Sequence, residues 1–160
     1  MVDIDFLAKV QVFQGLNHEQ LTGIVKLCKE AEFRSGARIF EQGEDAVYLW
    51  IVKKGRVDLR LESPGSASGE ENTISSISEA GAFGWSSFTS PHKYRLSGYC
   101  SGKHCKLIKV EREGLRQLFE KATDIGYVVM SNVAAVVGTR FHELQEEAAR
   151  RRGQDLLGGW

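Results

Sequence analysis

The spacing of hydrophobic and polar positions changes twice along the chain, which predicts a helical start, a strand-rich middle and a helical end. Near the start, Asn17 can cap a helix, and Gln20 stands at the position that returns the bond in a capping box. The apolar positions that follow have helical spacing: Leu21, Ile24, Val25 and Cys28. We therefore expect a helix from Asn17 that buries one face.

The middle of the chain, from Phe33 to Val110, has short apolar segments separated by glycine-containing turns. The segment Val47–Val52 is apolar throughout, which favours an inner strand. The segment Arg56–Leu61 alternates strictly between apolar and charged residues, which favours a strand with one buried face. Lys53-Lys54-Gly55 lies between them and predicts a hairpin. Many short strands are therefore expected here.

After a last predicted strand over Lys106–Val110, the helical spacing returns at Leu115, Leu118 and Phe119. Asp124 can cap a longer helix, and no proline interrupts the run from Ile125 to about Arg152. Its apolar residues cover more than one narrow stripe. We expect one side to pack on the β-domain and another to meet a second copy of the same helix.

The composition is that of one globular domain. The chain has 160 residues, of which 42% are hydrophobic and 26% are charged, and 21 basic residues balance 21 acidic ones. This balance lacks the electrostatic footprint of a dedicated DNA or anionic-membrane binder. Asp3 and Asp5 stand where a secretory signal carries basic and apolar residues, and no apolar run is long enough to span a bilayer. We therefore expect a cytoplasmic protein.

Three cysteines, Cys28, Cys100 and Cys105, are irregularly spaced, which favours reduced thiols. Cys100 and Cys105 flank His104, so a metal site has to be weighed. The remaining histidines are scattered, and zinc sites need four converging ligands, so we predict no metal site. A cupin-like metalloenzyme is disfavoured for the same reason, and a serine hydrolase is disfavoured because no Gly-x-Ser-x-Gly motif occurs.

The main candidate for chemistry is the stretch Gly81–Ser87, followed after a loop by Tyr94–Ser97. Two glycines let the backbone approach a ligand closely, and a short helix opening at Trp85 directs its first N–H groups toward an anion. Arg95 supplies a fixed charge that can form charge-assisted bonds with a phosphate. A Gly-x-x-Gly turn and a surface arginine also occur in many β-proteins without a ligand.

The order of these pieces resembles the cyclic nucleotide-binding domain family, specifically the sensor domains of bacterial catabolite-activator and fumarate-nitrate-type regulators. The resemblance covers Phe13 to about Leu144 and includes Ser35–Glu44, the segment Tyr48–Gly55 and the residues around Phe83-Gly84. It implies a mainly β fold with flanking helices (α+β). This fold is an eight-stranded double-stranded β-helix, or jelly roll, with an N-terminal helix and a long C-terminal helix. We predict one domain over residues 1–152, with the roll at about 33–110 and the long helix at about 124–152, and a flexible tail at 153–160.

The resemblance also assigns roles. Gly84 corresponds to the glycine that approaches the ribose-phosphate, and Arg95 to the phosphate arginine, counted back from Lys106-Leu107. Trp85 stands where cyclic nucleotide binders usually have a glutamate that accepts the ribose 2′-hydroxyl. An indole N–H donates but does not accept, so this replacement costs a bond to the ribose. The predicted ligand-binding residues are Phe83, Gly84, Trp85, Ser86, Ser87, Arg95, Leu96 and Ser97.

The function expected from the resemblance is a non-enzymatic sensor that binds a cyclic nucleotide, cAMP-like or a related phosphorylated ligand, without another cofactor. It would signal through the C-terminal helix, as a homodimer and to a regulated protein partner. Residues 153–160 cannot supply a helix-turn-helix domain, so no direct DNA binding is expected. The alternative is a fold that has lost nucleotide binding and acts as a protein-interaction or dimerisation module. On the long helix, residues around Asn132 and Thr139 are the expected neighbours of a ligand.

Overall fold

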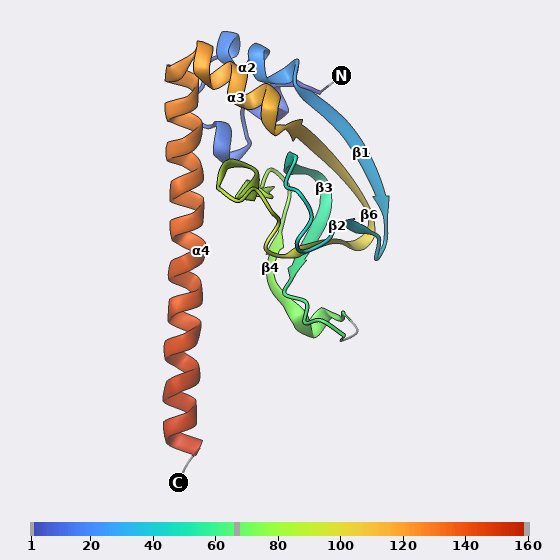
Figure 1. Ribbon diagram of the computed structural model, residues 1–160, viewed down its shortest axis with the longest axis vertical. Coiled ribbons are helices and arrows are strands. Elements are labelled where there is room, and N and C mark those ends of the chain that lie inside the picture. Colours follow the sequence, from blue (N-terminus) through green and yellow to red (C-terminus); the bar gives the residue numbers. More distant parts are fainter. Residues whose placement is uncertain (1, 66–67, 159–160) are drawn as a thin grey trace.

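The computed structural model describes residues 2–65 and 68–158, with side chains as far as Gln154. A curled antiparallel sheet forms a roll, helices cover one end of it, and the last helix stands along its side (Figure 1). The N-terminal helical elements are α1 (Ile4–Leu7), η1 (Gln11–Phe13) and α2 (His18–Val25). The strands are β1 (Cys28–Arg34), β2 (Arg38–Phe40), β3 (Tyr48–Arg60), β4 (Thr73–Ile77), β5 (Ala82–Phe83) and β6 (Ser97–Glu111). The remaining helical elements are η2 (Glu70–Asn72), η3 (Trp85–Phe88), α3 (Arg112–Lys121) and α4 (Thr123–Gly158).

The sheet is organised by one long ladder between β3 and β6. The strand order is β1-β6-β3-β4, with β2 added to β6 and β5 added to β3. The ladder runs from Tyr48 opposite Glu111 to Arg60 opposite Ser97. Everything between Arg60 and Ser97, including β4, β5 and η3, is the connection between these two strands. We call residues 81–97 of this connection the cassette.

The sheet has six strands within the described residues rather than the predicted eight. The predicted hairpin at Lys53–Gly55 is wrong, because the segments on either side of it form the single bent strand β3. Gly55 has a φ of 98° and lies where the β3–β6 register shifts. A Cβ atom there would lie 2.7 Å from the His104 carbonyl oxygen. The glycine therefore permits a close strand-to-strand contact at a bend and does not form a hairpin turn.

The predicted capping box of α2 is confirmed. The Asn17 side chain accepts from the Gln20 amide at 2.9 Å, and the Gln20 side chain accepts from the Asn17 amide at 2.8 Å. The helix is shorter than its apolar pattern suggests, because it ends at Val25 and Cys28 already begins β1. The return of helical structure after the last strand is confirmed by α3 and α4.

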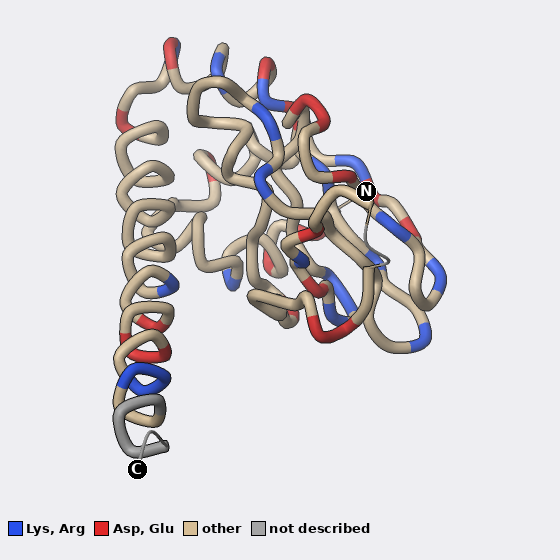
Figure 2. The backbone as a smooth tube through the Cα atoms, turned by 60° about the horizontal axis from the view of Figure 1, so that its bottom comes forward, with Lys and Arg blue, Asp and Glu red and all other residues tan. Residues whose placement is uncertain are grey.

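Helix α4 starts within one residue of the predicted position and continues to Gly158, so residues 153–158 are helical where a flexible tail was predicted. Residues 159–160 lie outside the described residues. The first part of α4 packs on the domain through Ile125, Val129, Val133 and Val136. Its later part carries bands of acidic and then basic side chains (Figure 2). No helix in the described ranges combines the length and apolar character needed to cross a bilayer.

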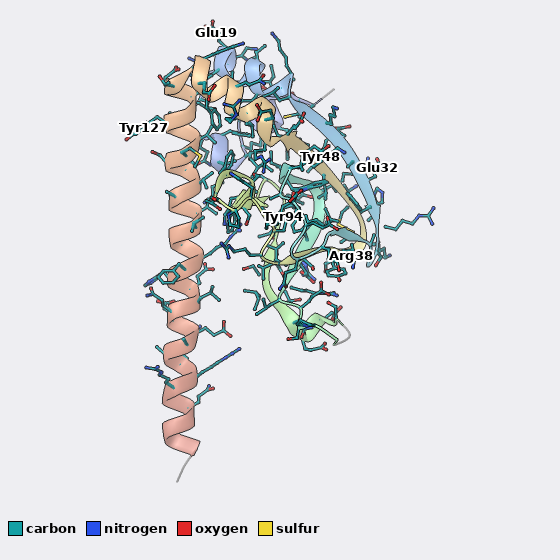
Figure 3. All side chains as sticks on the ribbon, viewed as in Figure 1. Glu19, Glu32, Arg38, Tyr48, Tyr94 and Tyr127 are labelled. Carbon is teal, nitrogen blue, oxygen red and sulfur yellow. A yellow bond between two sulfur atoms is a disulfide. The ribbon has the colours of Figure 1, made fainter. Side chains whose placement is uncertain are left out.

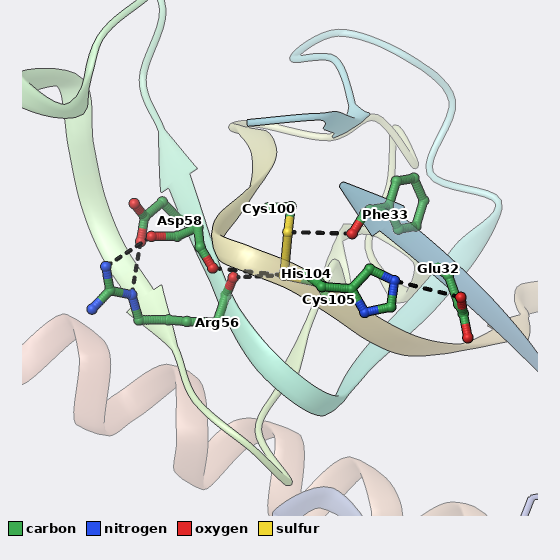
Figure 4. Close-up of a disulfide and its surroundings, with 8 residues drawn as sticks. Glu32, Phe33, Arg56, Asp58, Cys100, His104 and Cys105 are labelled. Atoms are coloured by element: carbon green, nitrogen blue, oxygen red, sulfur yellow. Dashed lines mark hydrogen bonds and ion pairs between the residues drawn. A yellow bond between two sulfur atoms is a disulfide. The ribbon is translucent and has the colours of Figure 1, made fainter. Parts of the chain in front are cut away.

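The expectation of reduced thiols is wrong for two of the three cysteines. Cys100 and Cys105 are joined by a disulfide with a Cα–Cα distance of 5.9 Å, and Cys28 is free (Figure 4). Between the two cysteines β6 makes an excursion opposite Gly55, which brings both side chains into the core of the roll. His104 points outward, 3.4 Å from Glu32. Across residues 2–65 and 68–158, no three His, Cys, Asp or Glu side chains are placed to share a metal ion.

Candidate ligand-binding site

A hollow of about 150 Å³ opens where the cassette faces the inside of the roll. Its volume is below the range of roughly 300–1,000 Å³ that is usual for small-molecule sites, so a nucleotide-sized ligand placed here would extend out of the mouth. The hollow contains residues from β2, β3 and the cassette, and these are Phe40, Leu59, Gly84, Trp85, Ser86, Tyr94, Arg95 and Leu96. Five of the predicted ligand-binding residues are among them.

Gly84 forms the turn at the base of this hollow. Its φ of 80° lies in the left-handed region, and a Cβ atom would meet the Trp50 ring at 3.2 Å, the Tyr48 carbonyl at 3.2 Å and the Tyr94 ring at 3.3 Å. Only glycine combines this backbone angle with this approach. Gly84 caps η3, whose first backbone bond runs from the Ser87 amide to the Gly84 carbonyl at 3.1 Å. The amides of Trp85 and Ser86 precede that bond, and their role as anion donors stays a prediction.

The floor of the hollow is aromatic and tightly bonded. The ring of Tyr94 stacks on Phe40 with a centroid distance of 3.8 Å and an interplanar angle of 13°. The Tyr94 hydroxyl donates to the Tyr48 carbonyl at 2.8 Å and accepts from the Trp50 indole at 3.1 Å. Burial raises the pKa of Tyr94 above its usual value. Figure 3 places Tyr94 and Tyr48 together inside the roll.

The sequence predicted this floor only in part. Phe40 and Leu59 line the hollow, although neither was predicted as a ligand neighbour. Tyr94 belongs to the candidate stretch Tyr94–Ser97 but was not among the predicted ligand-binding residues. Phe40 and Leu59 reach the hollow only because β2 and β3 both pair with β6, and this pairing is not visible in the spacing of residues along the chain.

Arg95 lies at the exposed rim of the hollow, beside the half-buried Leu96. Within the described part of the chain its guanidinium forms neither an ion pair nor a hydrogen bond. A cation without a partner at the mouth of an apolar hollow is available to an incoming anion.

Three predicted ligand-binding residues are buried outside the hollow. The ring of Phe83 packs 6.2 Å from Trp50 and 5.9 Å from Phe40. The Ser97 hydroxyl accepts from the Gln42 amide at 2.8 Å, and its hydrogen bond to Glu62 lowers the pKa of that carboxyl. Ser87 is fully buried, faces a second hollow between η3 and α3, and its hydroxyl has no partner in the described residues.

Trp85 lies between the hollow and α4. The Arg140 guanidinium carbon is 4.3 Å from the centroid of the Trp85 ring, and its Nη2 donates to the Ala82 carbonyl at 3.0 Å. Burial lowers the pKa of Arg140 to about 10.

The helix residues expected to lie nearest a ligand serve other purposes. The Asn132 side chain donates to the carbonyls of Val12 and Gln14, at 3.1 and 2.8 Å. The Thr139 hydroxyl bonds to Ala135 within its own helix, at 3.0 Å. Arg140, one position further on, contacts the cassette directly, at Trp85 and Ala82.

A scan against protein families matches the cyclic nucleotide-binding domain over residues 30–122. Among curated proteins, the chain is similar to a CRP-like cAMP-activated global transcriptional regulator of Mycobacterium tuberculosis. The two are 25% identical over 112 residues, which is 70% of this chain and 48% of that protein. The chain thus spans about half the length of this relative.

Two solved structures illustrate the likeness in fold. A putative cyclic nucleotide-binding protein from Geobacter metallireducens is 30% identical, with a TM-score of 0.76 over 89% of this chain and 100% of that one. The regulatory subunit of a cAMP-independent protein kinase A from Trypanosoma brucei is 16% identical, with a TM-score of 0.72 over 91% of this chain and 50% of that one. The second likeness concerns the fold alone.

Proposed function

The chain belongs to the cyclic nucleotide-binding domain family, and from this premise we propose that it is a non-enzymatic sensor for a cyclic nucleotide or a related phosphorylated ligand. The observation that carries the proposal is the hollow between the Gly84 turn and the unpaired Arg95. The ligand phosphate binds Arg95 and the amides of η3. The rest of the ligand lies against the aromatic floor formed by Phe40 and Tyr94.

Two contributions favour a ligand that carries a phosphate and an apolar body. Each charge-assisted hydrogen bond from an arginine contributes about 1.5–3 kcal/mol, and two parallel bonds also fix the orientation of the phosphate. The apolar floor contributes through the area it removes from water. Both contributions fit a ligand with one compact anionic group and one flat, weakly polar body.

Trp85 distinguishes among such ligands. Its indole cannot accept the hydrogen bond that a glutamate offers to a ribose hydroxyl. The loss of a charge-assisted bond lowers affinity for cAMP by about tenfold or more, at 1.4 kcal/mol per decade. We therefore expect the preferred ligand to depend less on a free 2′-hydroxyl than on the phosphate and the base.

We further propose that α4 mediates a homodimer. Several apolar side chains on α4 are exposed, with Tyr127 at 76% and Phe141 at 61%, and Figure 3 shows Tyr127 pointing away from the roll. The exposed positions follow each other by threes and fours or by seven, as in a coiled-coil seam: Tyr127, Met130, Val137, Phe141 and Leu144. A second copy of α4 that covers this stripe removes it from water and carries the signal to a protein partner in the cytoplasm.

Titration of the purified protein with cAMP, cGMP and cyclic dinucleotides tests the sensor function. Binding is measured by tryptophan fluorescence and calorimetry, because Trp85 lines the hollow. We expect a saturable change for at least one nucleotide and its loss in Arg95→Ala. If no nucleotide binds in either assay, the sensor function is wrong.

The alternative is a dimerisation or protein-interaction module without nucleotide binding. The small volume of the hollow, about 150 Å³, favours it. In that case Arg95→Ala leaves the oligomeric state and any partner binding unchanged. Sedimentation of Phe141→Glu, compared with the wild type, tests the dimer in both cases, and an unchanged molecular mass would exclude α4 as the interface.

A further inference from the structure

Arg140 is a partly buried cation that forms no ion pair with the side chains described by the structure. Its Nη1 is shielded from solvent and has no hydrogen-bond partner in the described residues, and burial lowers its pKa to about 10. Glu143 is the acidic residue whose charge affects it, yet the two form no ion pair. A desolvated charge without a counter-charge destabilises a fold, so its position calls for a reason other than stability.

The contacts of Arg140 explain its position. The guanidinium lies 4.3 Å from the centroid of the Trp85 ring, and Nη2 donates to the Ala82 carbonyl at 3.0 Å. Trp85 and Ala82 lie on either side of Phe83 and Gly84, so one side chain of α4 holds both ends of the cassette turn. The Trp85 side chain also lines the ligand hollow. The indole is thus shared between the hollow and α4.

We propose that Arg140 is a positioning residue for the ligand site. It holds the Trp85 indole as a preformed wall of the hollow without touching the ligand itself. This inference rests on the sensor function proposed above. Because coupling between two sites is reciprocal, a ligand that packs against Trp85 in turn stabilises the contact between the cassette and α4. The Arg140–Trp85 contact is then the link between the ligand site and the helix.

The expected size of the effect follows from the contact. A cation stabilises an indole ring more strongly when the pair is shielded from water, and loss of the Arg140 cation should weaken nucleotide binding about 3- to 30-fold. Without the Arg140 contact the Trp85 side chain is no longer held in place before the ligand binds. The entropy lost when the ligand orders Trp85 then lowers the affinity.

The test uses calorimetry with whichever of cAMP and cGMP binds the wild type. Arg140→Met keeps the apolar stem and removes the charge, Arg140→Lys keeps a charge without the planar fork, and the exposed Arg150→Met on the same helix is the control. We expect a 3- to 30-fold loss for Arg140→Met, a smaller loss for Arg140→Lys and no change for Arg150→Met. Thermal unfolding of each variant shows that it is folded.

Two further readouts separate positioning from a merely structural role. In a Trp85→Leu background, Arg140→Met should change affinity less than twofold, because the ring it acts through is gone. In the wild type, ligand should slow hydrogen exchange of α4 amides near residues 136–141, and in Arg140→Met it should not. Affinity within twofold of wild type in Arg140→Met, or the same loss in the Trp85→Leu background, overturns the inference. Absence of any nucleotide binding by the wild type instead overturns the sensor function on which the inference rests.

Discussion

The floor and the rim of the candidate site differ in burial and in how far their polar atoms are bonded within the protein. The floor consists of Gly84, Phe40 and Tyr94, which are enclosed by close contacts and whose polar atoms are bonded within the protein. The rim consists of Ser86, Arg95 and Leu96, which are at least partly exposed, although Leu96 also packs against the core of the roll. Substitutions in the floor should therefore cost stability, whereas substitutions at the rim should cost only affinity for ligand.

The largest expected effect is in the floor, for Gly84→Ala. An alanine in the left-handed region costs about 1–2 kcal/mol, and its Cβ would also press on the Trp50 and Tyr94 rings, so we expect a total loss of about 2–4 kcal/mol in the free energy of unfolding. Urea denaturation measures it. Gly36→Ala is the matched control, because Gly36 has a φ of 76° but open space around it. Equal losses at the two glycines would refute the close packing of the floor.

Tyr94→Phe removes the hydroxyl that bonds the Trp50 indole and the Tyr48 carbonyl. The Tyr48 amide also donates to this hydroxyl, so three polar groups lose a partner, and we expect a loss of about 1–3 kcal/mol in unfolding free energy. Tyr127→Phe, at a side chain that is 76% exposed, should change stability by less than about 0.5 kcal/mol. An unchanged denaturation midpoint in Tyr94→Phe would show that the hydroxyl does not bear on stability.

At the rim, Arg95→Lys keeps the charge and removes the planar fork that suits a phosphate. Nucleotide affinity measured by calorimetry should fall about five- to tenfold, a change of about 1 kcal/mol. Unfolding free energy should stay within about 0.5 kcal/mol of wild type, as it should in the control Arg34→Lys on β1. If Arg95→Lys also lowered the free energy of unfolding, Arg95 would contribute to the stability of the fold, as the floor residues do.

The smallest expected effects compare two adjacent serines. Ser86→Ala, at the rim, should lower ligand affinity by no more than about threefold and leave stability unchanged. Ser87→Ala removes a buried, unpartnered hydroxyl and should raise the unfolding free energy by about 1 kcal/mol without changing affinity. Loss of ligand binding in Ser87→Ala would mean that this hydroxyl reaches the ligand, as the sequence analysis expected.

Local patterns in the sequence were sufficient where a structure depends on neighbouring residues. The capping box of Asn17 and Gln20, the glycine turn at Gly84 and the start of α4 each depend on a few consecutive positions. The pattern failed at Gly55, because Lys-Lys-Gly is typical of a turn, and only the excursion of β6 opposite it makes the residue part of a bend. The Cys100–Cys105 disulfide was also missed, because this irregular part of β6 brings the two cysteines together and cannot be recognised from their number and spacing.

The candidate site was also predictable where it depends on neighbouring residues in the sequence, and not where it depends on distant ones. Gly84, Trp85 and Arg95 line one hollow because they belong to one continuous segment, and their binding of a ligand stays a prediction. Phe40 and Arg140 instead lie beside the cassette because of strand pairing and the passage of α4. Ser97 has a hydroxyl like that of Ser86, but its position in β6 directs it to the Gln42 amide. Residue type therefore predicted the chemistry available, whereas tertiary packing determined which side chains lie at the hollow.

The β3–β6 ladder also determines when, during folding, the site is completed. The paired residues closest in sequence are Arg60 and Ser97, and those farthest apart are Tyr48 and Glu111. Since the entropy cost of closing a loop grows with its length, pairing is expected to begin at Arg60 and Ser97 and to proceed toward the helices. That first closure joins the two ends of the segment that carries the whole cassette. Non-local pairing of this kind folds in milliseconds to seconds, and the ligand site should appear in that slow step and not before it.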